Sequence, residues 1–346
     1  MTKKPVLAGL LPQEIGVIIR NTTGLDLPAF RSAQICQWIK KAAAFDQMLN
    51  LPLALREDLA KNLRLYSSSV TGDFTDSDGT VKLRLGLEDG CSIEAVILND
   101  GKDRKTACLS AQAGCPLSCV FCKTGTLGFK RNLTAAEITE QFIFLRQKCP
   151  DISHIVIMGM GEPLFNLDEL RKAINYFTDV NGFGISKRRI TVSTAGICAG
   201  IADLADNGPD VRLAVSLTSA RQELREKLMP AAKANPLPSL KNSLVYYQNK
   251  NKRRITLETV LLKEINTGVK DAAAIAEFAE SLDTVINLIP WNPVDGLLLD
   301  GRPLQPPSAD ETAAFAGALA KLNLKVTMRL SKGKGVCGAC GQLGSL

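Results

Sequence analysis

The sequence lacks several features that would point to common functional classes. It has one histidine, His154, so a Ser-His-Asp triad or a histidine-rich zinc site has almost nothing to be built from. It has no run of 18 or more apolar residues and no convincing signal-peptide cleavage site, so we expect a cytoplasmic protein without a membrane span. His154 stands in an apolar segment, where we expect it to pack in a buried strand rather than act in catalysis.

Positive charge exceeds negative charge, with 42 Lys and Arg against 35 Asp and Glu, a net charge of +7. Such an excess suits an anionic partner such as nucleic acid, although each basic cluster taken singly is more typical of a solvated surface. Because the clusters stand beside the motifs described below, we favour the first interpretation. They lie at residues 102–105, 130–131, 187–189, 250–254 and 332–334.

The first hundred residues are predicted to form two small units. Residues 1–66 carry nine Lys or Arg against five Asp or Glu, and helical spacing of apolar residues predicts a basic helical accessory domain. Residues 67–103 contain two apolar segments split by Asp89-Gly90, a dipeptide typical of β-hairpin turns, so we expect a β-hairpin extension. The predicted helices cover residues 13–20, 30–49 and 52–65, and the predicted strands cover 80–87 and 91–98.

Strands and helices alternate from residue 104 to about 330. Six such units predict parallel strands with right-handed crossovers, and six are too few for a complete eight-unit barrel. We therefore expect an α/β fold built on a partial (β/α)6 barrel of the TIM type, followed by a flexible segment at 331–346. The predicted barrel strands are TACLS, HIVIMG, RITVST, RLAVSL, RITLETVLL and VINLIPW, with KVTMRL after them. The predicted helices are 134–148, 167–179, 197–206, 236–249, 270–282 and 309–322.

Three of the ten cysteines form a closely spaced motif. Cysteines in a chain without an export signal favour metal or thiol chemistry over structural disulfides. Cys115, Cys119 and Cys122 have the spacing CxxxCxxC and directly follow the first predicted barrel strand. Three thiolates leave one iron of a [4Fe–4S] cluster without a protein ligand, and an open position is typical of a catalytic metal site. The motif therefore predicts a cluster on which S-adenosylmethionine (SAM) binds and is cleaved to a radical.

A zinc site is the alternative interpretation of these cysteines. Cys337 and Cys340, spaced CxxC, could complete a tetrahedral thiolate set. The protein would then be a zinc-dependent RNA-binding module without catalysis. The place of the motif after a first strand, with Phe121 before its last cysteine and a series of strand–helix units behind it, favours the cluster.

Polar residues follow the predicted strands at their carboxyl ends, where the chemistry of α/β barrels collects. Gly161 allows close backbone approach to a ligand, and Glu162 can bind an ammonium group. One such residue is a weak signal, but several on one rim suit a nucleoside with its hydroxyls and ring nitrogens. The other candidates are Ser193, Ser216, Thr218 and Asn292.

Two further cysteines suit thiol chemistry. Cys340 lies between Gly338 and Gly341, and a cysteine on mobile backbone suits a nucleophile that must meet two partners. Cys108 lies seven residues before Cys115, on the strand that leads into the motif. For Cys108 a buried packing role is the alternative.

These motifs together resemble the RlmN/Cfr family of radical SAM RNA adenine methyltransferases, over nearly the whole chain. The amino-terminal FRSAQICQWIKK resembles the accessory helical domain of that family, which implies that residues 1–66 bind RNA. The terminal ACGQL is the most specific part of the resemblance. The other matching segments, in the family's order, are SAQAGCPLSCVFCKTGTLGFKRNLT, MGMGEPLFN, VSTAGI, VSLTSA, LETVLLKEINTG and NLIPWNP.

The resemblance implies a methyltransferase (EC 2.1.1.-) that uses two molecules of SAM. Cys340 matches the cysteine that is methylated first. A radical made from the second SAM takes a hydrogen from that methyl group, and the resulting carbon radical adds to adenine. Cys108 matches the cysteine that resolves the protein–RNA adduct by a transient disulfide with Cys340, and Glu94 matches the proton acceptor. The residues implied to hold SAM are Gly161, Glu162, Ser193, Ser216, Thr218 and Asn292.

The implied partners are an RNA and an electron donor such as flavodoxin or ferredoxin, and the implied state is a monomer. The favoured target is C2 of an adenine in 23S rRNA and/or tRNA, and C8 is an alternative that the sequence leaves open. Three positions depart from the family: Thr218 replaces a common histidine, Lys123 replaces a small residue, and Cys337 is an additional thiol. These departures leave a different RNA or adenine open as a substrate.

Overall fold

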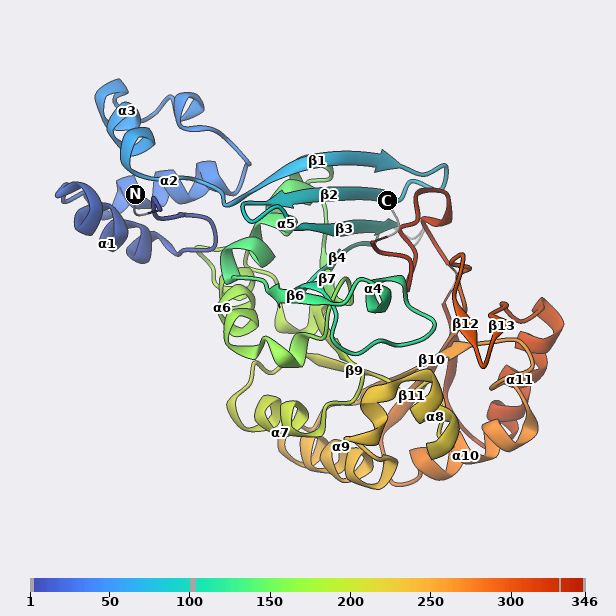
Figure 1. Ribbon diagram of the computed structural model, residues 1–346. Helices are drawn as coiled ribbons and strands as arrows, with labels where there is room; N and C mark the ends of the chain where they lie inside the picture. The colour runs from blue at the N-terminus through green and yellow to red at the C-terminus, as the bar shows by residue number, and fades with distance from the viewer. Residues whose placement is uncertain (1–2, 100–103, 330, 345–346) are drawn as a thin grey trace.

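A ten-stranded sheet runs through the molecule in the order β1-β2-β3-β4-β7-β8-β9-β10-β11-β14 (Figure 1). The structure, a computed structural model, describes residues 3–99, 104–329 and 331–344. One half of the sheet is antiparallel and lies beside the amino-terminal helices, and the other half is parallel and is covered by the later helices (Figure 1).

The parallel half contains the six predicted barrel strands, each paired in parallel with its neighbour. The strand predicted as KVTMRL pairs in parallel with β11 and adds a seventh. The prediction of a partial α/β barrel is therefore confirmed. The strands are β4 (Lys105–Leu109), β7 (His154–Ile157), β8 (Ile190–Thr194), β9 (Arg212–Ser216), β10 (Ile255–Leu261), β11 (Thr284–Pro290) and β14 (Val326–Met328).

Helices cover the barrel because each presents an apolar stripe to the strands. In α6 the buried residues recur three or four positions apart, and the residues between them are exposed or half-buried. Thr134 begins α5 with a capping box, in which its hydroxyl accepts a hydrogen bond from the backbone of Glu137. All six predicted helices are present: α5 (Ala135–Lys148), α6 (Leu167–Thr178), α7 (Cys198–Asn207), α9 (Leu237–Asn251), α10 (Val269–Ala279) and α11 (Ala309–Lys321).

The antiparallel half has one strand more than the predicted hairpin. β2 (Val81–Leu87) and β3 (Ser92–Asn99) form that hairpin across the Asp89-Gly90 turn. β1 (Ser68–Thr75) pairs with β2, and its polar sequence SSVTGDFT has too few apolar residues for its pattern to predict a strand. β3 pairs antiparallel with β4, so the extension continues the barrel sheet.

The amino-terminal module consists of α1 (Pro12–Thr23), α2 (Ala29–Ile39), the 3-10 turn η1 (Phe45–Gln47) and α3 (Leu53–Asn62). The prediction that the second helix reaches residue 49 is wrong. Ala42 has a positive φ of 56°, which ends helical geometry. The Tyr66 hydroxyl lies 3.0 Å from the Ile39 carbonyl oxygen and donates to it, so the helix end is satisfied by a side chain.

The module is packed firmly on the barrel. The Lys40 ammonium donates to the carbonyl oxygens of Asn181 and Gly182, at 3.0 and 2.7 Å. The buried Glu140 carboxylate accepts the backbone N–H groups of Ser67 and Ser68. One continuous apolar core joins the two units. The predicted boundaries after residues 66, 103 and 330 stay predictions, and residues 100–103 and 330 lie outside the described ranges.

Short elements complete the chain and position the site. None of the helices in the described ranges has both the length and the apolar character that a membrane crossing requires. The short elements are β5 (Gln112–Gly114), α4 (Lys123–Thr126), β6 (Phe129–Asn132), η2 (Pro163–Phe165), η3 (Lys187–Arg189), α8 (Gln222–Leu228), η4 (Pro230–Lys233), β12 (Leu298–Leu299), β13 (Arg302–Pro303) and η5 (Lys334–Val336).

Candidate active site

The CxxxCxxC motif forms the loop between β5 and β6, beyond the carboxyl end of the first barrel strand. The Cys115 N–H donates to the Gly128 carbonyl oxygen at 3.1 Å, which closes the base of the loop. The Cys122 N–H donates to the Cys119 carbonyl oxygen at 3.1 Å, so the last two cysteines share one turn. All three cysteines line a single cavity of about 170 Å³.

The three thiols stand in an environment that opposes negative charge. Burial raises the pKa of Cys115 to about 12 and also raises the pKa of Cys119 and of Cys122. Negative charge on neighbouring thiolates adds to each of these increases. Thiolates here need a nearby positive charge, and iron ions supply it. The donor set therefore fits an iron–sulfur cluster.

The three cysteines of the motif do not by themselves form a zinc site. In the part of the chain that the structure describes, no three His, Cys, Asp or Glu side chains converge as ligands of a single metal ion. Zinc would require sulfur atoms at about 2.3 Å around one ion. In a [4Fe–4S] cluster each thiolate binds a different iron, so the sulfurs stand farther apart. Of the two further cysteines offered for the zinc interpretation, Cys340 lines this cavity and Cys337 does not.

Gly114 sets the start of the cluster loop. It has a φ of +73°, and a Cβ at this position would lie 1.8 Å from the Gly128 carbonyl oxygen. We expect Gly114→Ala to displace Cys115 and to lose most of the iron that the reconstituted protein binds, because the clash is with backbone. Iron per chain after anaerobic reconstitution measures this. Gly128→Ala is the matched control, since its φ is also positive but its Cβ would meet nothing within 4 Å. Equal iron in the two variants would contradict the assignment.

The same cavity contains five of the six residues predicted to hold SAM. Thr218 is the exception. It is fully buried, it does not line this cavity, and its hydroxyl has no hydrogen-bond partner among the described residues. The structure therefore does not bring Thr218 to the others. The five that line the cavity are Gly161, Glu162, Ser193, Ser216 and Asn292.

Glu162 is a buried carboxylate that faces the cluster loop. Its Oε1 accepts the Leu164 N–H at 3.0 Å, and its Oε2 accepts the Ala195 N–H at 2.8 Å. Burial raises the pKa of Glu162 to about 7, and these two donors oppose the increase. Gly161 is required beside it because a Cβ there would lie 2.4 Å from the Cβ of Gln112. A cationic ammonium group would stabilise the ionised carboxylate by a charge-assisted hydrogen bond.

The carboxyl-terminal segment crosses the cavity and carries Cys340 into it. The backbone N–H of Lys123, one of the residues that depart from the family, donates to the Gly341 carbonyl oxygen at 2.7 Å. The contact is made by the backbone and does not depend on the lysine side chain. The Asn292 side-chain nitrogen donates to the Cys340 carbonyl oxygen at 3.0 Å. Asn292 Oδ1 is buried without a partner in the described residues, as expected of an acceptor that awaits a ligand. Movement of this segment during a reaction stays a prediction.

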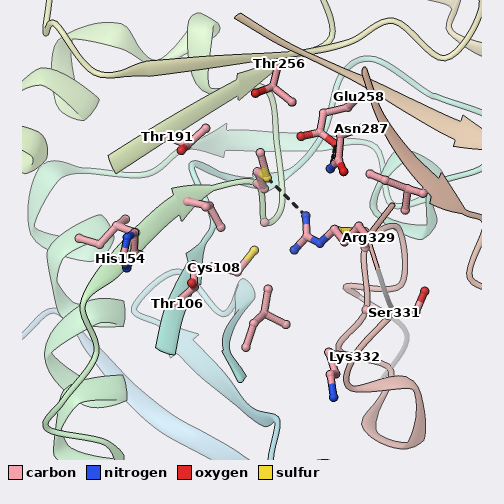
Figure 2. Close-up of a pocket in the computed structure, with 18 of the residues that line it drawn as sticks. Thr106, Cys108, His154, Thr191, Thr256, Glu258, Asn287, Arg329, Ser331 and Lys332 are labelled. Carbon is pink, nitrogen blue, oxygen red and sulfur yellow. Dashed lines mark hydrogen bonds between the residues drawn. The ribbon is translucent and has the colours of Figure 1, made fainter. Parts of the chain in front are cut away.

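Cys108 lines a second, larger cavity of about 680 Å³ that extends into the barrel (Figure 2). Cys340 and Cys122 line this cavity as well as the first one, so the two spaces meet at these thiols. Burial raises the pKa of Cys108 to about 12, and negative charge on Cys340 adds to the increase. All ten cysteines are free thiols. The structure thus brings together the two cysteines that the resemblance pairs.

Glu94, on β3, contacts the end of the carboxyl-terminal segment and lines neither cavity. Its buried carboxylate pairs with Lys82 at 3.1 Å and accepts the Gly344 N–H at 2.7 Å. These contacts hold the segment in place. A role of Glu94 as proton acceptor stays a prediction.

Several charged residues of the site escaped sequence reasoning. Arg329 and Glu258 line both cavities, and the negative charge of Cys340 raises the pKa of Arg329 (Figure 2). Glu258 accepts a hydrogen bond from the Asn287 side chain at 2.7 Å, and burial raises its pKa. His154 lines the larger cavity and is half-buried, so the expectation of a fully buried side chain is wrong, and a packing rather than catalytic role stays a prediction. It is the first residue of β7, where the side chain meets the open end of the barrel.

Arg225 is a fully buried arginine that positions two strand ends. Its guanidinium donates to the carbonyl oxygens of Ala195 and Ser216, at 2.6 and 2.9 Å. Ala195 and Ser216 both line the smaller cavity. The segment QELREKL resembles a surface helix, so only the tertiary contacts identify this role.

Comparison with known proteins supports these features. Residues 109–273 match the radical SAM superfamily. A relative from Treponema denticola, described as "Probable dual-specificity RNA methyltransferase RlmN", is 47% identical over 343 residues, covering 99% of this chain and 96% of its own. A relative of the same description from Thermus thermophilus is 40% identical, covering 98% and 93%. The crystal structure of a radical SAM methyltransferase from Sphaerobacter thermophilus superimposes with a TM-score of 0.92 at 33% identity, covering 99% of this chain and all of that one.

The fold and the site define a radical SAM enzyme, a class that uses SAM together with an iron–sulfur cluster. A "Dual-specificity RNA methyltransferase RlmN" from Nitratidesulfovibrio vulgaris is a further relative, 39% identical over 93% of this chain and 90% of its own. With such identity over nearly the full length of both chains, the protein belongs to the RlmN family.

Proposed function

We propose that this protein is a radical SAM RNA methyltransferase that methylates C2 of an adenine in ribosomal RNA, transfer RNA or both. One observation carries the proposal: Cys340 and Cys108 line one cavity, and Cys340 and Cys122 also line the adjoining cavity with the predicted SAM ligands. This arrangement supports a methyl-carrying role for Cys340 and a resolving role for Cys108, because both thiols line the larger cavity, which is open enough for a substrate. The names of the relatives support RNA as that substrate.

The residues of the smaller cavity would hold the cofactors. Cys115, Cys119 and Cys122 are the thiolates for a [4Fe–4S] cluster, which when bound supplies the electron that cleaves SAM. Glu162 would pair with the SAM ammonium group, and the free Oδ1 of Asn292 would accept a further hydrogen bond. Ser193 and Ser216 offer hydroxyls to the nucleoside.

The two cysteines would divide a difficult substitution into steps. Cys340 receives a methyl group on its sulfur, and a carbon-centred radical on that group adds to adenine. The amidine carbons of adenine are poor nucleophiles, so they cannot displace the methyl group of SAM directly. Radical addition does not require the carbon to act as a nucleophile. After the addition, the attacked carbon of adenine loses its proton and the adduct gives up one electron to the electron-transfer partner. The Cys108 thiolate then attacks the Cys340 sulfur and the sulfur–carbon bond breaks. A disulfide forms, and the displaced carbon takes up a proton to become the methyl group of the released base. An external thiol reductant must break that disulfide before the next turnover.

The proposal includes the partners of the reaction. The electron comes from a small donor such as flavodoxin or ferredoxin, and the enzyme works as a monomer in the cytoplasm, where its RNA is found. The base must reach deep thiols, so the target nucleotide is unpaired or flipped from its stack.

Nucleoside mass spectrometry of treated RNA tests the proposed activity. Anaerobically reconstituted protein is incubated with SAM, a reductant and either ribosomal or transfer RNA that lacks the modification. We expect 2-methyladenosine in at least one of them. Formation of 8-methyladenosine instead would support the alternative site of methylation on the same base. Neither product from either RNA would overturn the proposed function.

A further inference from the structure

Four of the barrel strands have an arginine at their amino end, either as the first residue or directly before it. The residues two and four positions later share the face of that arginine. Arg104 and Arg189 precede β4 and β8, Arg254 precedes β10, and Arg212 is the first residue of β9. Side chains two apart along a strand point to the same side. The four series are Arg104, Thr106 and Cys108; Arg189, Thr191 and Ser193; Arg212, Ala214 and Ser216; and Arg254, Thr256 and Glu258.

This shared face is the interior of the barrel. Every member of the four series except Ala214 lines one of the two cavities. Barrel interiors are usually filled by layers of bulky branched side chains. Here the middle layer contains threonines, and Figure 2 shows Thr106, Thr191 and Thr256 arranged around open space. The small residues leave a passage from the arginine layer to the layer of reactive groups.

The arginines surround the mouth at the amino ends of the parallel strands, opposite the cluster loop. All four are exposed. The guanidinium groups of Arg189, Arg212 and Arg254 form no ion pair or hydrogen bond with any residue that the structure describes. Asp210, a nearby carboxylate, is instead paired with Arg253. Unpaired positive charge at the mouth of a cavity attracts an anionic ligand.

The depth of the passage suits one nucleotide. Cys108 lies four residues beyond Arg104, which is about 13 Å along a strand at ~3.3 Å per residue. An arginine side chain can extend outward to a phosphate while a base enters between the threonines. A base within a duplex cannot leave the helix axis by this distance without flipping.

We propose that Arg104, Arg189, Arg212 and Arg254 form a phosphate-binding collar through which the target nucleotide of the RNA reaches Cys340. This inference rests on the proposed function and adds the route of the substrate. One guanidinium group can donate two parallel hydrogen bonds to a phosphate. Several such groups around one opening would hold the RNA backbone on both sides of a flipped nucleotide. The threonine hydroxyls below the collar then contact the ribose or the base. The reaction thus uses both ends of the barrel: SAM at the carboxyl ends of the strands and RNA at the amino ends.

The test compares two triple variants in the cluster-loaded enzyme. Arg189→Ala, Arg212→Ala and Arg254→Ala are combined in one variant. Lys233→Ala, Lys270→Ala and Lys321→Ala, at exposed positions elsewhere on the barrel, are combined in a charge-matched control. The measurements are RNA binding by fluorescence anisotropy at several salt concentrations, kcat and KM for RNA methylation, and methylation of Cys340 by intact mass.

We expect the collar variant to bind RNA at least tenfold more weakly than wild type. The slope of log K against log salt should fall by about 2, because three phosphate contacts at ~0.7 each are lost. KM should rise far more than kcat falls, Cys340 should still be methylated, and the control should behave as wild type. Unchanged binding and salt slope, or an equal change in the control, would overturn the collar. If the wild-type protein binds RNA through these arginines but methylates no RNA, the collar would stand and only the proposed activity would be refuted.

Discussion

Replacement of Cys340 by alanine is expected to abolish methylation of RNA completely. Cys340 and the following Gly341 line both the cavity with the motif cysteines and the cavity with Cys108, and of these two residues only Cys340 carries a thiol. Without its sulfur there is no protein atom to carry the methyl group, so no product forms even when SAM is cleaved. Nucleoside mass spectrometry measures the product, and 5′-deoxyadenosine released in the same reaction measures SAM cleavage.

Cys337→Ala is the matched control for this variant. Cys337 lies three residues earlier in the same glycine-rich segment, but it lines neither cavity. We expect this variant to retain product formation, because its thiol does not reach the reacting groups. Product formation by Cys340→Ala would assign the enzyme to a mechanism without a methylated cysteine.

The companion variant Cys108→Ala makes the step after addition visible. If Cys108 resolves the adduct, its loss should leave RNA attached to Cys340 as a species that resists denaturation and carries added mass on the tryptic peptide of that residue. Cys108→Ala combined with Cys340→Ala should show no such species. Absence of the adduct in the single variant, together with loss of product, would remove Cys108 from the resolving role.

Removal of any cysteine of the CxxxCxxC motif is expected to eliminate the cluster and all of the radical chemistry. Cys119→Ala leaves two thiolates, too few to hold a cube that already lacks one protein ligand. The reconstituted variant should be colourless where wild type is brown, with iron and sulfide near background and no 5′-deoxyadenosine from SAM. Absorbance, metal analysis and single-turnover SAM cleavage measure these three results.

Cys149→Ala is a suitable control for the cluster variant, because this cysteine follows α5 outside both cavities. Circular dichroism of both variants separates loss of the cluster from loss of the fold. A colourless wild-type protein that binds one zinc ion per chain would restore the zinc interpretation. A Cys119→Ala variant that keeps its iron would show that this thiol is not a ligand.

Much of the barrel follows from local sequence patterns. The apolar runs at residues 105–109 and 190–194 predict buried strands because side chains in a parallel sheet are covered on both faces. The helix at 167–178 has an apolar stripe at helical spacing and is present within one residue of its predicted end. The polar strand β1 and the early end of α2 could not be predicted in this way, since pairing with β2 and a contact from Tyr66 decide them.

The sequence by itself determined the alternation of strands and helices in the barrel and the CxxxCxxC motif after its first strand, because each is a pattern of adjacent residues. The pairing of Cys108 with Cys340 was implied by the family resemblance, and the structure brings both thiols to one cavity. Only the tertiary structure decided which polar groups converge. It leaves Thr218 outside the smaller cavity, brings Arg225 to the carbonyl groups at two strand ends, and gathers Arg329, Cys340 and Glu258 around the same cavity. It also gathers four arginines around one mouth. Such convergence depends on strand register and packing over long separations in sequence, and no local pattern contains that information.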